Sequence, residues 1–271
     1  MTELQLWTGV GRTETGYVRA SNQDALALLN DCGVWILADG MGGHPAGDIA
    51  AQTAVAVATQ RARERASWLH EHPSGAAEFM TDLVTSANRR IHDLMKAKPS
   101  LRGMGTTLVA LVMKPSPLPV AHIAHLGDSR AYLYRAGQLK QLTRDHTLVQ
   151  KLVQRGLIDE ATALTHPERH ILAKGLGMGA DMQPELTSIP VIPHDLIVLC
   201  SYGLTKMLTD TAIASILSRA DGNPDRACHN LIDEALNRGG EDNVTVIVVA
   251  GMPPAGMELT MHNPNPDVSH C

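Results

Sequence analysis

The most informative stretch of the chain is Val34-Trp35-Ile36-Leu37-Ala38-Asp39-Gly40-Met41-Gly42-Gly43-His44. Its first five residues are apolar and predict a buried β-strand. Asp39 ends this strand, and the glycines that follow allow the backbone to approach a metal ion or a phosphate closely. The stretch therefore predicts a carboxylate ligand at the tip of a strand.

Three more carboxylates stand at the borders of β-like apolar runs. They are Asp24 before the run 25–29, Asp128 after the run 120–126, and Asp242 before the run 244–250. Hard divalent cations prefer oxygen ligands, and strand ends from distant parts of a chain can meet at one edge of a sheet. The four aspartates therefore indicate one shared cation site.

Composition sets limits on the class of protein. The chain has 271 residues, 44% of them hydrophobic, which is enough for a real core. A formal net charge of -5 argues against nucleic acid as a ligand. Four scattered cysteines without a CxxC pair fit a reducing cytosol. Because no apolar run could cross a bilayer and the N-terminus has no signal-like core, we expect a soluble cytoplasmic protein.

The first half of the chain combines β-like runs with two long helical patterns. Strands are expected over 4–11 and 24–37, the latter broken by a turn at 30–33. Helices are expected over 45–65, where alanine is frequent, and over 74–98, where apolar residues recur at helical spacing. The runs 106–113, 120–126 and 131–134 predict an antiparallel meander.

The second half begins with an irregular segment over 145–184, which we interpret as a flap inserted into the domain. A strand over 195–200, helices over 211–219 and 224–238, and a strand over 243–250 follow. Residues 252–271 read as a disordered tail. Because β-helix-β alternation is absent, the pattern predicts an α+β fold of two packed antiparallel sheets flanked by helices.

Seven motifs in order resemble the metal-dependent protein phosphatases of type 2C, the PPM family, in a form typical of bacteria. They are VRASNQDA (18–25), ADGMGGH (38–44), GMGTT (103–107), HLGDSR (125–130), LTRDHT (142–147), CSYGL (200–204) and GGEDNVT (239–245). The resemblance implies a four-layer α-β-β-α sandwich with a flap, and a phosphatase domain over residues 1–251. It also implies hydrolysis of phosphoserine and phosphothreonine in proteins, in opposition to a Ser/Thr kinase.

Roles for the acidic residues follow from this resemblance. It implies two Mn²⁺ or Mg²⁺ ions bridged by Asp39, with a bridging water as the nucleophile. The Gly40 carbonyl matches a ligand of the second ion and Asp242 a ligand of the first. Asp128 matches a ligand of a third, weaker site.

Two residues of the first motif match further roles in the family. Arg19 matches the arginine that binds phosphate, for which a planar guanidinium is well suited. Asp24 matches a residue that orders metal-bound water. Gln23 stands where some members have a glutamate, although glutamine also occurs there in bacterial members.

One position departs from the family. The sixth motif normally reads Ser-Asp-Gly, with the aspartate a ligand shared by the first and third ions, and this chain has Ser201-Tyr202-Gly203. A phenol is neutral at physiological pH and is a poor ligand for a hard cation. We therefore expect the third ion to be weakly bound or absent and turnover to be reduced.

Three hypotheses remain open at this point. The first is an active, monomeric phosphatase acting on a phosphorylated protein. The second is an impaired pseudophosphatase that binds phosphoproteins through the same fold. The third, an aspartyl-phosphate hydrolase with Asp39 as nucleophile, does not explain Asp128 and Asp242.

Other polar residues of these motifs have plainer interpretations. His44, His125 and His146 are expected to make structural hydrogen bonds, because no HExxH pattern or tight His/Cys cluster is present. Thr106 and Thr107 are expected to pack beside the site without acting as nucleophiles, since no base lies nearby in sequence.

Overall fold

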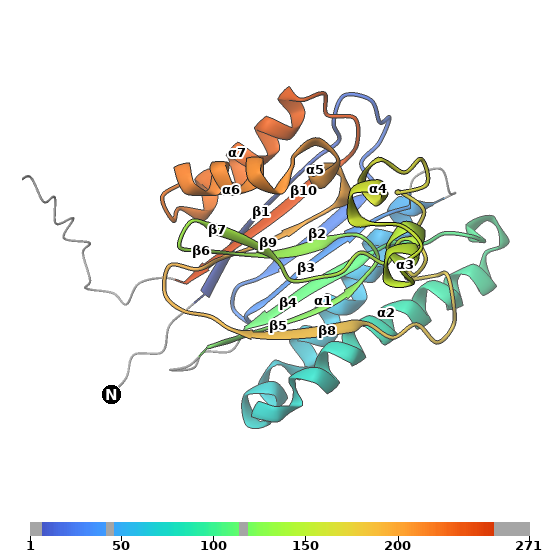
Figure 1. Ribbon diagram of the computed structural model, residues 1–271. Coiled ribbons are helices and arrows are strands. Elements are labelled where there is room, and N and C mark those ends of the chain that lie inside the picture. The colour runs from blue at the N-terminus through green and yellow to red at the C-terminus, as the bar shows by residue number, and fades with distance from the viewer. Residues whose placement is uncertain (1–6, 42–45, 114–118, 252–271) are drawn as a thin grey trace, which may run out of the picture.

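The computed structural model describes residues 7–41, 46–113 and 119–251, whose strands form two antiparallel five-stranded sheets (Figure 1). Sheet A has the order β1 (Trp7–Glu14), β10 (Val244–Gly251), β9 (Leu196–Cys200), β6 (Arg130–Arg135) and β7 (Gln138–Gln141). Sheet B has the order β2 (Asp24–Leu29), β3 (Val34–Asp39), β4 (Leu108–Met113), β5 (Val120–Leu126) and β8 (Glu185–Pro190).

Helices cover the outer face of each sheet. Sheet B carries α1 (Gly47–Glu71) and α2 (Ala76–Ala97), joined by the 3₁₀ turn Pro73–Gly75, and a second such turn, Pro99–Leu101, follows α2. Sheet A carries α5 (Tyr202–Met207), α6 (Asp210–Arg219) and α7 (Pro224–Asn237). The predicted four-layer α-β-β-α sandwich is confirmed. Among the described helices, none combines the length and apolar character needed to cross a membrane.

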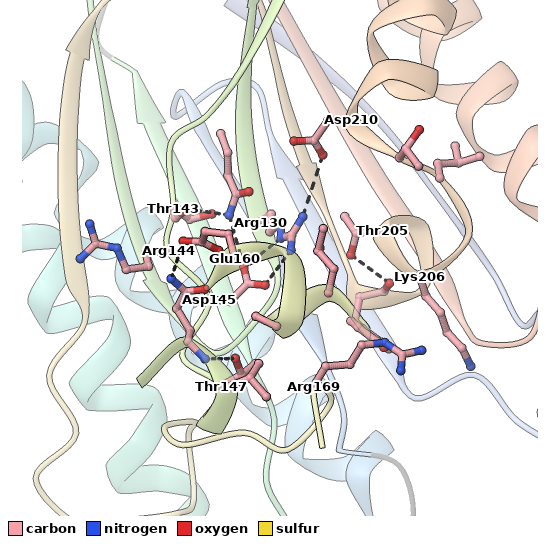
Figure 2. Close-up of a pocket in the computed structure, with 18 of the residues that line it drawn as sticks. Arg130, Thr143, Arg144, Asp145, Thr147, Glu160, Arg169, Thr205, Lys206 and Asp210 are labelled. Atoms are coloured by element: carbon pink, nitrogen blue, oxygen red, sulfur yellow. Dashed lines mark hydrogen bonds and ion pairs between the residues drawn. The ribbon is translucent and has the colours of Figure 1, made fainter. Parts of the chain in front are cut away.

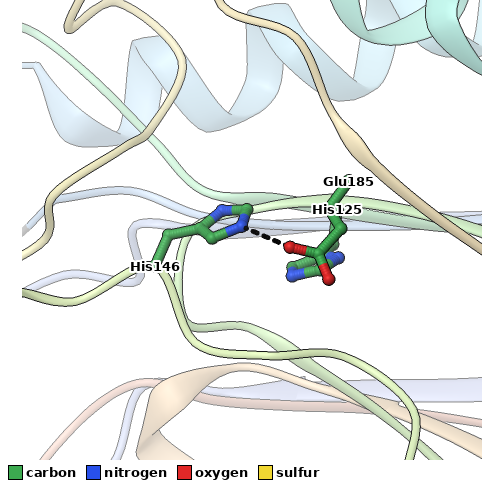
Figure 3. A group of neighbouring side chains, drawn as sticks. All are labelled: His125, His146 and Glu185. Atoms are coloured by element: carbon green, nitrogen blue, oxygen red, sulfur yellow. Dashed lines mark hydrogen bonds and ion pairs between the residues drawn. The ribbon is translucent and has the colours of Figure 1, made fainter. Parts of the chain in front are cut away.

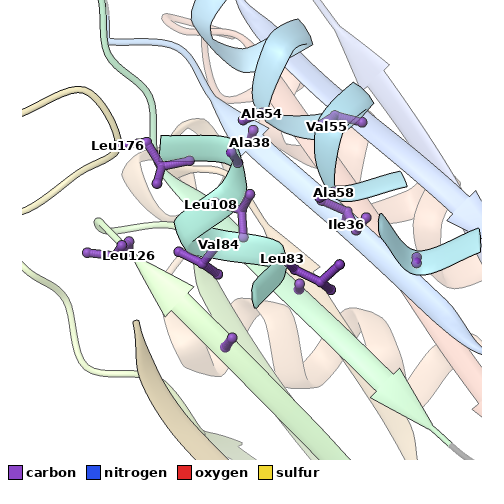
Figure 4. Close-up of a cluster of buried hydrophobic side chains, with 14 of the residues drawn as sticks. Ile36, Ala38, Ala54, Val55, Ala58, Leu83, Val84, Leu108, Leu126 and Leu176 are labelled. Carbon is purple, nitrogen blue, oxygen red and sulfur yellow. The ribbon is translucent and has the colours of Figure 1, made fainter. Parts of the chain in front are cut away.

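The continuous apolar runs of the central strands follow from this layering. Alternate side chains of a strand point to opposite faces, and both faces of each sheet are covered. In β3, Ile36 and Ala38 pack toward α1 and α2, whereas Trp35 and Leu37 pack between the sheets. Figure 4 shows Ile36 and Ala38 among the side chains of the helical layer. Because both of its faces are covered, β3 is apolar from Val34 to Ala38 and becomes polar only at its end, Asp39.

The alanine pattern of α1 suits its position against sheet B. Ala50, Ala54 and Ala58 are fully buried in the cluster shared with α2 and the sheet. Small side chains let a helix approach its neighbours closely, and alanine has the highest helix propensity. The helix continues to Glu71, beyond the predicted end at residue 65.

The predicted meander in the middle of the chain is wrong. The strands β4 and β5 pair in sheet B, but β6 pairs with β7 and β9 in sheet A. The chain passes between the sheets at the turn Gly127-Asp128-Ser129, where Gly127 has a φ of 112°. Apolar runs of similar length do not reveal which strands pair. Strands that follow one another in the sequence therefore need not be neighbours in one sheet.

The edge strands β7 and β8 were missed. Both are largely solvent-exposed, and β8 ends on Pro190, so neither has the apolar run of a central strand. The segment predicted as a flap lies between these strands and contains α3 (Leu148–Gln154) and α4 (Glu160–Thr165). The tail predicted over 252–271 lies outside the described residues, as do Gly42, Gly43 and His44.

Candidate functional site

The four predicted aspartates lie together at one edge of the sandwich. Asp24 and Asp39 face each other across the β2–β3 pair of sheet B. Asp242 lies two residues before the start of β10 in sheet A, and Asp128 lies in the turn that connects the two sheets. The charges of Asp24, Asp128 and Asp242 all act on the Asp39 carboxyl. The convergence predicted from strand ends is therefore present.

The pKa values of Asp24, Asp39 and Asp128 are all raised in this cluster. Burial, followed by the charges of Asp24, Asp128 and Asp242, raises the pKa of Asp39 well above its usual range. Burial and the charge of Asp145 raise the pKa of Asp128 to about 7. Burial also raises the pKa of Asp24 to about 6, although a hydrogen bond from Thr245 opposes the shift. A bound cation would relieve this repulsion.

A buried oxygen of Asp24 gives a second indication that a cation fits here. Its Oδ2 accepts a hydrogen bond of 2.6 Å from the Thr245 hydroxyl, but its Oδ1 is buried without a hydrogen-bond donor. A buried acceptor without a partner is costly. An ion or its water ligand at this position would satisfy it.

The backbone of Asp39 is held by two threonines. The Asp39 N–H donates to the Thr107 hydroxyl at 3.0 Å, and the Thr106 hydroxyl donates to the Asp39 carbonyl at 2.8 Å. The Thr107 hydroxyl also bonds to that of Ser129, at 2.6 Å, next to Asp128. Both hydroxyls are thus engaged in placing the aspartates, as expected of residues that pack beside the site.

Gly40 has no space for a side chain. A Cβ atom there would collide with the carbonyl oxygens of Gly47 and Gln23. The Gly40 N–H also donates to the Gln23 carbonyl at 3.0 Å. The glycine is therefore required by the close approach of three chain segments directly after Asp39.

Arg19 and Asp242 bind each other. The Arg19 Nε lies 2.8 Å from Oδ1 of Asp242, and its Nη2 donates to Oδ2 at 2.9 Å. This two-point geometry is the one that a guanidinium would offer to a phosphoryl group. The arginine predicted to bind phosphate and the aspartate predicted to bind metal are thus neighbours. Their ion pair competes with phosphate binding by Arg19 and with metal binding by Asp242.

Tyr202 is the first residue of α5, and its backbone N–H donates to Oδ2 of Asp39 at 3.2 Å. The residue at the position where the resemblance implies an aspartate is therefore next to Asp39. Tyr202 also lines a cavity of about 930 Å³ between the flap and helices α5 and α6. Figure 2 shows this cavity, with Arg169 and Glu160 on the flap side and Lys206 and Asp210 on the other.

The sequence-based site did not include Asp145, which the structure places near Asp128. Asp145 binds the Nε and Nη2 atoms of Arg130 at 2.9 and 2.8 Å. Its charge contributes to the raised pKa of Asp128. Asp145 belongs to the fifth motif, so its presence there could have marked it as a candidate. A motif does not reveal, however, that this aspartate lies near Asp128.

His125, His146 and Glu185 form a compact group (Figure 3), and His146 is bonded to Gly127 of the Asp128 turn. The Gly127 N–H donates to Nδ1 of His146, so its Nε2 carries the proton and donates to Glu185 at 3.3 Å. The two imidazoles are stacked, with centroids 4.6 Å apart and planes inclined by 14°. Nearly parallel rings cannot both direct an in-plane lone pair at one metal ion. These contacts agree with the structural role predicted for both histidines.

The chain matches the family model described as Protein phosphatase 2C over residues 14–231. It is 36% identical over 244 residues to a serine/threonine phosphatase stp of Listeria welshimeri, covering 88% of this chain and 93% of the relative. The chain therefore belongs to the protein phosphatase 2C family.

Solved structures agree with this assignment. A crystal structure of the serine/threonine phosphatase PstP/Ppp of Mycobacterium tuberculosis matches with a TM-score of 0.79 and 34% identity, covering 90% of this chain and 98% of that one. The catalytic domain of PstP in complex with two manganese ions matches with a TM-score of 0.77 and 33% identity, covering 92% and 100%.

Proposed function

We propose that this protein is a metal-dependent phosphatase for phosphoserine and phosphothreonine in proteins, and that residues 1–251 form its catalytic domain. The observation that carries the proposal is the convergence of Asp24, Asp39, Asp128 and Asp242 at one edge of the sandwich. The Listeria and Mycobacterium relatives are named as serine/threonine phosphatases, which supports the same activity. We further propose that it works as a cytoplasmic monomer against a cognate Ser/Thr kinase.

The donor set suits Mn²⁺ or Mg²⁺. Asp39, the Gly40 carbonyl and Asp242 would hold two ions, and Asp128 would hold a weaker third one, since all offer the oxygen atoms that hard cations prefer. The relative solved with two manganese ions supports this choice of metal. When bound, two such ions neutralise phosphoryl charge and activate a water for attack on phosphorus.

The protein's own residues position the phosphate and the acids. Arg19 would release Asp242 and turn its guanidinium to two phosphoryl oxygens, which are fixed by parallel hydrogen bonds. Thr106 and Thr107 hold the Asp39 backbone, and Asp24 would offer its unpartnered Oδ1 to a water of the site. These residues orient the reacting groups before the chemical step.

Tyr202 would reduce the activity. Its side chain offers no anionic oxygen at the start of α5, beside Asp39, where the family's aspartate would add a negative charge. We propose that the first ion is consequently held less tightly and that the third is weak or absent.

The experiment is hydrolysis of phosphothreonine peptides with and without Mn²⁺, comparing wild type, Tyr202→Asp and Asp39→Asn. We expect Mn²⁺-dependent turnover in wild type, faster turnover and tighter Mn²⁺ binding in Tyr202→Asp, and none in Asp39→Asn. Equal metal affinity in wild type and Tyr202→Asp would remove the proposed effect of Tyr202. Phosphopeptide binding without turnover in both proteins would instead establish the pseudophosphatase.

A further inference from the structure

The loop over residues 15–23, between β1 and β2, carries Arg19 but contains no helix or strand of its own. Residues 17–21 at its tip are exposed, and Tyr17 retains 72% of its accessible surface. A guanidinium binds a phosphoryl group well only if its backbone is placed correctly, because a misplacement of about 1 Å is costly in catalysis. The loop therefore needs an external support.

Asn243 supplies that support. Its side chain is buried, and its Nδ2 donates to the carbonyls of Thr15 and Ser21 at 2.8 and 3.0 Å. Its Oδ1 accepts from the Gln23 N–H at 2.9 Å. The Asn243 amide thus uses both of its donor hydrogens and its acceptor oxygen on the loop, and so joins the beginning of the loop to its end.

The same turn before β10 makes a second attachment to the loop. The Tyr17 N–H donates to the Gly240 carbonyl at 2.7 Å. Gly16 has a φ of 76° and lies so close to the Asp242 and Gly240 carbonyls that a Cβ would collide with them. The loop is therefore seated on the turn that carries Asp242, which explains why Arg19 reaches that carboxylate.

We propose that Asn243 is a positioning residue that holds the Arg19 loop in place for recognition of the phosphoryl group. This inference rests on the proposed phosphatase function and on the role of Arg19 in it. Asn243 acts through Arg19, because all three of its side-chain hydrogen bonds go to the backbone of the loop that carries Arg19. Its removal weakens phosphate binding because the loop, with Arg19, leaves the turn.

The experiment is a double-mutant cycle with Asn243→Ala, Arg19→Ala and the double variant. Binding of inorganic phosphate is measured by calorimetry in the presence of Mg²⁺, and KM and kcat are measured with p-nitrophenyl phosphate. We expect each single variant to lose about 10- to 100-fold in phosphate affinity and the double variant to lose no more than Arg19→Ala.

Asn88→Ala is the matched control. Its amide makes the same three kinds of bond, two to the carbonyls of Gly179 and Ala180 and one from the Gly177 N–H, in the segment before β8 and not in the Arg19 loop. We expect comparable destabilisation of the fold with unchanged phosphate affinity. If Asn243→Ala does not fold, Asn243→Ser provides the same comparison with a shorter polar side chain.

Unchanged phosphate affinity in Asn243→Ala, or additive losses in the double variant, would overturn the inference. In either case wild type would still bind phosphate and turn over substrate. Failure of the proposed function gives a different result, in which wild type itself neither binds phosphate in the presence of Mg²⁺ nor hydrolyses p-nitrophenyl phosphate.

Discussion

Replacing Asp128 with asparagine tests the electrostatics of the acidic cluster in the protein without divalent cations. Burial and Asp145 raise the pKa of Asp128 from 3.8 to about 7. An acid whose folded-state pKa is raised binds more protons in the native state than in the unfolded state. The stability that the protonated acid allows is therefore complete below pH 3.8. It is lost progressively as the pH rises from 3.8 to above 7.

The size of the effect follows from the shift. At about 1.4 kcal/mol per pKa unit, ionising Asp128 costs the native state roughly 4 kcal/mol above pH 7. About 2–3 kcal/mol of this loss falls between pH 5 and pH 8. Asparagine has nearly the same shape and does not titrate, so this loss should be missing in Asp128→Asn.

The assay is urea unfolding in EDTA at pH 5, 6, 7 and 8. We expect the free energy of unfolding of wild type to fall more steeply with pH than that of Asp128→Asn, and the variant to be the more stable protein at pH 8. Asp233→Asn, which changes an exposed acid on α7, is the control and should keep the wild-type slope. Parallel pH profiles for wild type and Asp128→Asn would refute the reasoning.

Further predictions concern other parts of the site. Arg19→Gln should bind Mn²⁺ about tenfold more tightly by calorimetry, because the guanidinium no longer competes for Asp242; equal or weaker affinity would contradict the competition. Gly40→Ala should lower the free energy of unfolding by about 2–4 kcal/mol in urea titrations, because its Cβ meets two backbone carbonyls; wild-type stability would show that this contact relaxes easily.

The layers of the fold were predictable from the sequence because burial on two faces makes central strands continuously apolar. The runs at β3 and β10 are of this kind, and the alanines of α1 and the helical spacing in α2 marked the outer layer. Strand pairing was not predictable in the same way. The partner of β6 depends on Gly127 turning the chain into the other sheet, a long-range choice that leaves no trace in local periodicity.

The candidate site, like the fold, was only partly predictable from the sequence. Acids at strand ends could be identified because a charge at the end of an apolar run is conspicuous, and the structure brings them together. The ion pair between Arg19 and Asp242 could not be read from residues 223 positions apart. The three bonds of Asn243 were equally hidden, because two of their partners are backbone carbonyls that no side chain identifies.

Anomalous diffraction from crystals soaked in Mn²⁺ tests the central claim most directly, since it locates each bound ion. We expect two strong peaks that share the Asp39 carboxylate, one also coordinated by Asp242, with Arg19 turned away from that aspartate. A weak third peak or none is expected beside Asp128, because a tyrosine at position 202 brings no carboxylate to the site. Fully soaked crystals without a peak at Asp39 would contradict the account.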